Sequence, residues 1–181
     1  MLKHSSKKSG YTLIEVLVVV SIMGVLSTMG VVSLRGAVIN TRMKDSALNV
    51  TAFLERIANE ANRLSKKICV VKDNDQRLSA YVADKCSDLS GADIVDSYLL
   101  DAPAKFGGCG GKIDDFGGSE WANGALFEPR IGLSAAPSEG FVCMRYGNSD
   151  TYGMAVKEKD KNKIYPMLGY EEDGIIRFHE L

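Results

Sequence analysis

The sequence of 181 residues has few of the side chains on which most enzyme sites depend. It contains two histidines, His4 and His179, near its opposite ends. A Ser-His-Asp or Cys-His arrangement would need His179, almost at the C-terminus, and no catalytic motif accompanies it. The four cysteines include no C-x-x-C spacing, which argues against a zinc site or a thioredoxin-like site. We therefore expect a protein that is not an enzyme and that has no metal or cofactor.

An excess of basic charge is also lacking. The chain has 22 Lys and Arg residues against 23 Asp and Glu residues, a net charge of −1. Residues 1–10 contain Lys3, Lys7 and Lys8 and no acid, so the remaining chain has 19 basic and 23 acidic residues. A domain that binds nucleic-acid phosphates is normally basic. The composition therefore argues against nucleic acid as a partner.

Proline is absent before Pro103, which leaves room for one long helix. Beyond Arg35, apolar residues recur at alternating spacings of four and three, which indicates one apolar stripe on an amphipathic helix. The stripe consists of Met43, Ala47, Val50, Leu54, Ile57, Ala61, Leu64 and Ile68. The pattern predicts a helix from Tyr11 to about Lys67. Its second half is expected to lie on a sheet, since a strand-rich region follows, and a coiled coil is the alternative.

The stretch from Gly10 to Leu34 is the most unusual part of the chain. Nineteen uncharged residues follow Glu15, and Tyr11 to Leu34 as a helix would span about 36 Å, enough for a bilayer core of about 30 Å. The preceding lysines predict that residues 1–10 face the cytoplasm. A carboxylate in a membrane helix is costly and indicates function. A signal peptide or plain anchor is the alternative, but no A-x-A cleavage site follows and neither needs Glu15.

The rest of the chain has strand patterns separated by turn residues. Ile68–Lys72 and Leu78–Ala83 flank a polar turn and predict a hairpin. Residues 86–125 are rich in glycine and predict a long loop with a short helix over 93–100. Antiparallel strands are then expected at Ala125–Phe127, Phe141–Tyr146, Thr151–Lys157, Lys163–Met167 and Gly174–His179. The predicted class is α+β, with segments 1–10 (leader), 11–34 (membrane) and 35–181 (globular domain).

All four cysteines, Cys69, Cys86, Cys109 and Cys143, follow the hydrophobic stretch. If this region faces an oxidising compartment, an even number predicts two disulfides. Three pairings are possible. We favour Cys86–Cys109, because both lie in irregular stretches whereas the other two lie on predicted strands.

Two stretches resemble ligand-binding motifs but fail in detail. An EF-hand loop starting at Asp73 would need glycine at its sixth position, where Leu78 stands. The glycines before Lys112 lack the Ser or Thr that a phosphate-binding loop requires after the lysine. The adjacent Asp114 and Asp115 could bind calcium with loop carbonyls, but such a pair is usually only solvated. A turn and a flexible loop are the better interpretations.

The hexapeptide Gly10-Tyr11-Thr12-Leu13-Ile14-Glu15, between a basic leader and an apolar run, resembles the type IV prepilin signature. That family includes type IV pilins, minor pilins and type II secretion pseudopilins, and Tyr11 stands where phenylalanine is commoner. The resemblance implies that prepilin peptidase cuts between Gly10 and Tyr11 and that Tyr11 is then N-methylated. It also implies that Glu15 meets the N-terminal amine of a neighbouring subunit during filament assembly.

The same resemblance implies a pilin-like fold, a location and a set of partners. The chain would cross the inner membrane once, keep its C-terminal domain outside the cytoplasm and then enter a pilus or pseudopilus. Its partners would be other pilin or pseudopilin subunits, the prepilin peptidase and the inner-membrane assembly platform.

Two further features bear on the branch of the family. Major subunits usually have a proline about where Val32 stands. The segments 126–132 and 173–178 resemble the GspH/FimT minor (pseudo)pilins, although Ile131 interrupts the usual Pro-Arg-Gly order. The alternative function is a FimT-like minor pilin that binds DNA for uptake. The last forty residues hold six basic and seven acidic side chains, which favours a solvated surface over a DNA-binding one.

Overall fold

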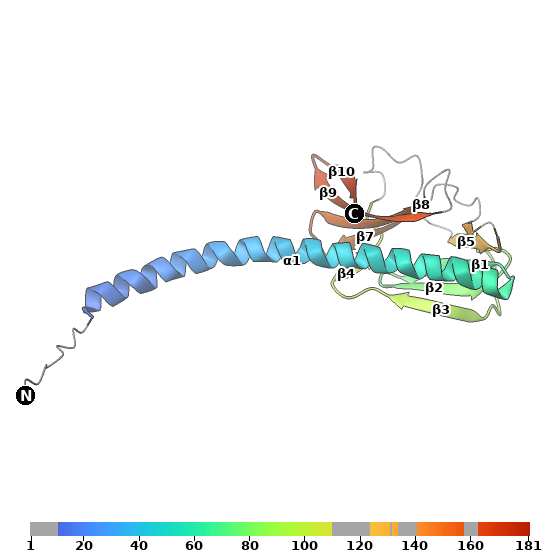
Figure 1. Ribbon diagram of the computed structural model, residues 1–181, viewed down its shortest axis with the longest axis horizontal. Coiled ribbons are helices and arrows are strands. Elements are labelled where there is room, and N and C mark those ends of the chain that lie inside the picture. The colour runs from blue at the N-terminus through green and yellow to red at the C-terminus, as the bar shows by residue number, and fades with distance from the viewer. Residues whose placement is uncertain (1–10, 110–123, 131, 134–140, 158–162) are drawn as a thin grey trace, which may run out of the picture. The chain divides into compact units, whose positions relative to one another are not determined.

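The structure is a computed structural model that describes residues 11–109, 124–130, 132–133, 141–157 and 163–181 (Figure 1). The side chains of residues 29–33 in the first helix lie outside this description. The chain divides into two compact units, Met1–Val38 and Ile39–Leu181. Helix α1 (Leu13–Leu64) runs through both sequence ranges, and the C-terminal unit combines its second half with antiparallel sheets. The predicted α+β class is confirmed.

The C-terminal end of α1 lies three residues before the predicted one, and its hydrogen bonds explain why. Ser65 has a left-handed backbone conformation with φ of 51°. The Lys66 N–H donates to the Ala61 carbonyl at 3.3 Å, and the Ser65 N–H donates to the Asn62 carbonyl at 3.2 Å. This pair of bonds is a Schellman motif, which normally has glycine at the position of Ser65. The sequence pattern missed this end because serine is a weak helix-stop signal.

The predicted apolar stripe of α1 forms the main core of the C-terminal unit. Met43, Ala47, Val50, Leu54, Ile57 and Ala61 are all buried. They pack with strand residues from both sheets, including Ile68, Phe127, Met144 and Ala155. Ile68 belongs to the first strand and not to the helix, although it continues the stripe in the sequence. The interpretation of one helix packed on sheets, and not a coiled coil, is confirmed.

The first sheet contains five strands in the order β3-β2-β1-β5-β6. Its strands are β1 (Ile68–Asn74), β2 (Arg77–Val82), β3 (Ile94–Leu99), β5 (Ala125–Glu128) and β6 (Gly132–Leu133). The β1–β2 hairpin agrees with the prediction, and the Gln76 N–H donates to Asn74 Oδ1 at 2.8 Å within its turn.

The short helix predicted over 93–100 is wrong, because this stretch forms strand β3. A bulge explains the error. Tyr81 pairs with Ile94 and Ala80 pairs with Asp96, so Val95 is an extra residue in the ladder. Val95 and Tyr98, three positions apart, therefore both pack against the core. That spacing imitates the period of a helix.

The second sheet contains five strands in the order β10-β9-β8-β7-β4. Its strands are β4 (Ala104–Phe106), β7 (Phe141–Tyr146), β8 (Thr151–Lys157), β9 (Ile164–Glu172) and β10 (Ile175–Glu180). The last four form the expected antiparallel meander. The predicted strand at 125–127 belongs instead to the first sheet, beside β1. The predicted loop over 86–125 also contains β3 and β4.

Helix α1 and strand β8 approach each other closely. A Cβ placed on Gly153 would lie 3.0 Å from Met43 Cε and 3.2 Å from the Met43 carbonyl oxygen. These distances are tighter than ordinary van der Waals contacts, so a side chain here would have to displace Met43. The absence of a side chain at Gly153 therefore allows the helix to lie directly on the second sheet.

The four cysteines form two disulfides, Cys69–Cys86 and Cys109–Cys143. The favoured pairing of Cys86 with Cys109 is therefore wrong. Each disulfide joins a strand cysteine to one in an irregular segment, with Cα atoms 5.4 Å and 6.0 Å apart. Position in strand or loop was a poor guide, because a strand cysteine can lie beside an irregular segment that follows a neighbouring strand, as Cys69 does at the end of β2.

A second buried cluster lies around the alternating residues of β8. Tyr152, Met154 and Val156 are buried together with the Cys109–Cys143 disulfide and Ile176. This confirms that the three β8 residues share one face. The Tyr152 hydroxyl donates to Glu171 Oε2 at 2.5 Å. Burial, and then this hydrogen bond, raise the pKa of Tyr152 to about 12.

The raised pKa of Tyr152 predicts a loss of stability in strong alkali. An unfolded tyrosine ionises near pH 10, so between about pH 10 and 12 the unfolded chain releases a proton that the folded chain keeps. The stabilising contribution of Tyr152 is present below pH 10 and falls as the pH rises through this window. At pH 8, Tyr152→Phe should cost about 1.5–3 kcal/mol, the usual value of a hydrogen bond to a charged group.

Denaturant titrations of the parent and Tyr152→Phe from pH 8 to pH 11.5 would check this. The stability difference between the two proteins should shrink above pH 10. If the free energies of unfolding of the two proteins differ by the same amount at every pH, Tyr152 does not retain its proton above pH 10 in the folded state.

Candidate functional site

The start of helix α1 is defined by Thr12. Tyr11 and Thr12 precede the helix, and the N–H groups of Glu15 and Val16 donate to the Thr12 carbonyl at 3.1 Å and 3.2 Å. The Glu15 N–H also lies 3.3 Å from Thr12 Oγ1. Thr12 is therefore the N-cap, and Glu15 occupies the third helical position.

This arrangement gives Glu15 a local role. Thr12-x-x-Glu15 has the residue order of a capping box, in which threonine caps the helix and glutamate lies three positions later. A carboxylate in the first turn also faces the positive end of the helix dipole. The Thr-x-x-Glu order of this cap is present in the sequence, within the hexapeptide that resembles a processing site.

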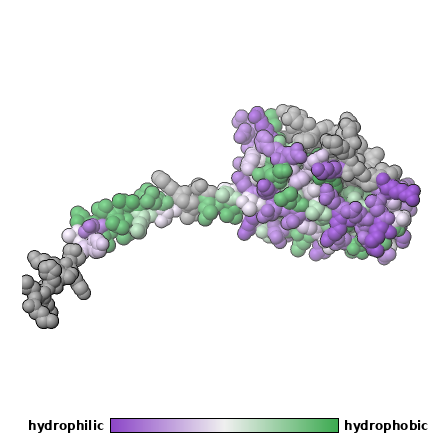
Figure 2. Space-filling view, in the orientation of Figure 1, coloured by the Kyte–Doolittle hydropathy of each residue, from purple (hydrophilic) through white to green (hydrophobic). Residues whose placement is uncertain are grey.

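On both sides of Glu15, the first half of the helix carries exposed apolar side chains. Leu13 is 83% exposed and Ile14 is 71% exposed. Others in the exposed set are Val16, Leu17, Val18, Val19, Val20, Ile22, Met23, Val25 and Leu26. Figure 2 shows this stretch as an almost continuous apolar surface. Among the described residues, no helix has both the length and the apolar character needed to cross a membrane.

The hydroxyl groups in this stretch are satisfied within the helix itself. Ser21 Oγ donates to the Leu17 carbonyl at 2.8 Å, and Ser27 Oγ donates to the Met23 carbonyl at 2.7 Å. Thr28 Oγ1 donates to the Val25 carbonyl at 2.8 Å. A polar group that already has an intrahelical partner costs little to remove from water. Glu15 is thus the residue of this stretch whose burial would require a partner.

The structure describes part of the predicted processing site. Tyr11 is 83% exposed and lies outside the helix, whereas Gly10 lies outside the described residues. Glu15 is one turn further on, at the beginning of the helix. The candidate calcium pair Asp114 and Asp115 also lies outside the described residues.

Comparison with known proteins identifies the same N-terminal stretch. The family described as the prokaryotic N-terminal methylation motif matches residues 5–31. Neither the curated proteins nor the solved structures contain a match to this chain. The matched segment includes Gly10, Tyr11 and Glu15. The chain therefore has a type IV prepilin-like N-terminus, of the kind that prepilin peptidase processes.

Proposed function

We propose that this chain is a minor pilin of a type IV pilus or a minor pseudopilin of a type II secretion system. In this proposal, residues 1–10 are a leader, 11–34 form the membrane and filament-core segment, and 35–181 form the domain that the filament displays. Prepilin peptidase cuts after Gly10, and the new N-terminal amine of Tyr11 is methylated. The role is structural and not catalytic.

The observation that carries this proposal is the exposed apolar beginning of α1. Each apolar side chain of this kind gains about 1.5–3 kcal/mol when it is buried. A bilayer would bury them before assembly, and the helices of neighbouring subunits would bury them afterwards. Tyr11 and Thr12 lie outside the helix and are exposed, so the residues after the proposed cleavage bond are accessible.

Glu15 is the group whose stability would differ between the bilayer and the assembled filament. A carboxylate surrounded by apolar side chains needs a partner of opposite charge. The N-terminal amine that cleavage creates on a neighbouring subunit would supply that charge. The Thr12 cap holds Glu15 on the first helical turn, near the end of the mature chain.

The two disulfides and the missing proline support the finer assignments. Disulfides persist in oxidising compartments, which fits a domain outside the cytoplasm of a single-pass inner-membrane protein. Proline is absent from the whole of α1, including the position of Val32, which favours a minor over a major subunit.

The N-terminal mass of the membrane-extracted protein tests the processing step. We expect a chain that begins at Tyr11 and carries one additional methyl group. A chain in assembled filaments that still begins at Met1 would overturn the proposal.

Replacement of Glu15 tests the assembly step. Losing one partner of a buried ion pair costs about 3–5 kcal/mol, so Glu15→Ala should reduce incorporation into filaments at least tenfold while membrane insertion continues. Glu55→Ala is the matched control, because Glu55 is an exposed acid on the same helix, within the C-terminal unit. Immunoblots of sheared filaments and of membranes would measure both. Equal incorporation of the two variants would contradict a role for Glu15 in assembly.

A further inference from the structure

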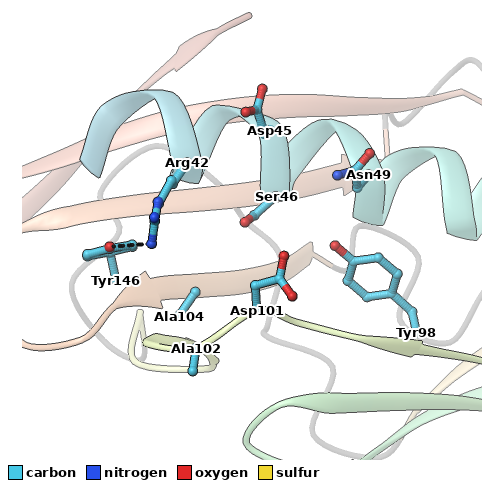
Figure 3. A pocket seen from close by; sticks show the side chains of 9 residues that line it. All are labelled: Arg42, Asp45, Ser46, Asn49, Tyr98, Asp101, Ala102, Ala104 and Tyr146. Atoms are coloured by element: carbon cyan, nitrogen blue, oxygen red, sulfur yellow. Dashed lines mark hydrogen bonds between the residues drawn. The ribbon is translucent and has the colours of Figure 1, made fainter. Parts of the chain in front are cut away.

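A polar cavity of about 460 Å³ lies between α1 and the edges of both sheets (Figure 3). Strand β3 is an edge of the first sheet, and β4 is an edge of the second. Arg42, Ser46 and Asn49 of α1, which lie on one helix face by their spacing, line one side of the cavity. Tyr98 at the end of β3 and Asp101 in the following link line the other. The volume is within the usual range for small-molecule sites.

Two of these groups are held in place by contacts with neighbouring side chains. The Tyr98 ring packs against Phe53 and Phe106, with ring centroids 5.7 Å and 6.4 Å away. Its hydroxyl end points into the cavity (Figure 3). On the opposite side, Arg42 Nη1 donates to the Tyr146 hydroxyl at 3.3 Å. Such support reduces the entropy cost of binding a ligand.

The link that carries Asp101 is also anchored. The Leu100 N–H donates to the Gln76 carbonyl at 2.7 Å, and Leu100 is buried. The Ala104 N–H donates to the Asp101 carbonyl at 3.0 Å, which closes a turn. The carboxylate of Asp101 is thereby presented from a fixed backbone position toward Ser46 (Figure 3).

The charges around the cavity are mixed and select against a simple anion. Asp101 and the nearby Asp45 oppose an anion, and Arg42 partly offsets their attraction for a cation. The remaining polar groups are the neutral hydroxyls and amide of Ser46, Asn49 and Tyr98. The Tyr98 phenol is protonated at neutral pH, as tyrosine normally is, and burial, and then the Asp101 carboxylate, raise its pKa further.

We propose that this cavity binds a neutral saccharide of one or two rings. Each sugar hydroxyl both donates and accepts a hydrogen bond, which matches a lining that holds guanidinium and phenol donors together with carboxylate and amide acceptors. Tyr146, which also lines the cavity, supplies apolar ring atoms for the C–H groups of a sugar. The proposal goes beyond filament assembly and does not depend on it, because every residue that it uses belongs to the C-terminal unit.

Saturation-transfer NMR on the full chain tests the proposal, in a detergent without a sugar head group. The probes are maltose, cellobiose, lactose and N,N′-diacetylchitobiose, with glycine and acetate as charged comparisons. We expect saturation transfer to the ring protons of at least one disaccharide, and weaker or no transfer to glycine and acetate. If no disaccharide responds, or if glycine or acetate binds more tightly than every disaccharide, the proposal is wrong.

Variants then locate the site. Tyr98→Phe keeps the ring contacts and removes the hydroxyl, and Asn49→Ala removes an exposed amide, so neither should unfold the domain. Each should weaken binding of the responding sugar about 3- to 10-fold, the value of one hydrogen bond. Ser97→Ala is the matched control, since Ser97 is the exposed neighbour of Tyr98 and does not line the cavity. Binding that is unchanged in both test variants would overturn this assignment of the site.

Discussion

Leu54→Ala should lower the free energy of unfolding of the C-terminal unit by about 3 kcal/mol, within the usual range for a buried leucine. Leu54 is fully buried in the centre of the α1 stripe, among core residues contributed by both sheets. Its removal would leave a cavity between a helix and two hydrogen-bonded sheets. These elements cannot easily move together to fill such a cavity, so most of the lost packing energy should be observed.

The same helix provides the control for this prediction. Leu48 is 42% exposed and lies outside the core cluster, so Leu48→Ala should change stability by no more than about 0.5 kcal/mol. Urea titrations of both variants, followed by near-ultraviolet circular dichroism, would measure the difference. Similar effects for the two substitutions would mean that the α1 stripe is not the helix face that packs on the sheets.

Removing the Cys109–Cys143 disulfide with a Cys109→Ser/Cys143→Ser pair should cost about 4 kcal/mol. The two cysteines are separated by 34 positions, and the loop that they close restricts the unfolded chain by approximately this amount. The disulfide also belongs to the buried cluster around Tyr152, so serine hydroxyls would be placed among apolar side chains. We therefore expect the loss of the Cys109–Cys143 disulfide to destabilise the protein more than the loss of the Cys69–Cys86 disulfide.

The Cys69–Cys86 disulfide supplies the comparison. Its cysteines are separated by 17 positions, so the matching Cys69→Ser/Cys86→Ser pair should cost about 3 kcal/mol. Denaturant midpoints of the two double variants and the parent would give the order of the effects. A larger loss for the Cys69–Cys86 variant would indicate that local packing, and not loop length, controls these contributions.

The parts of the fold that follow from local pattern were predictable from the sequence. The α1 stripe, the β1–β2 hairpin and the β7–β10 meander depend on residue periodicity and turn chemistry, which neighbouring residues determine. The prepilin-like hexapeptide is also local, because its order and the apolar run after it are read along one segment. The Thr12 cap is local as well, because its Thr-x-x-Glu order lies within the same hexapeptide.

The remaining features depend on residues that are distant in the sequence. Val95 acts as a bulge only because β2 lies beside β3, and without that partner the spacing of Val95 and Tyr98 favours a helix. Likewise, the pairing of Cys69 with Cys86 depends on the β1–β2 register, which sets Cys69 opposite Tyr81 near the end of β2. The saccharide cavity is the clearest case, since α1 and two sheet edges bring its residues together. Periodicity therefore determined α1, the β1–β2 hairpin and the β7–β10 meander, but only tertiary packing decided that residues 94–99 form a strand and which surfaces and side chains meet.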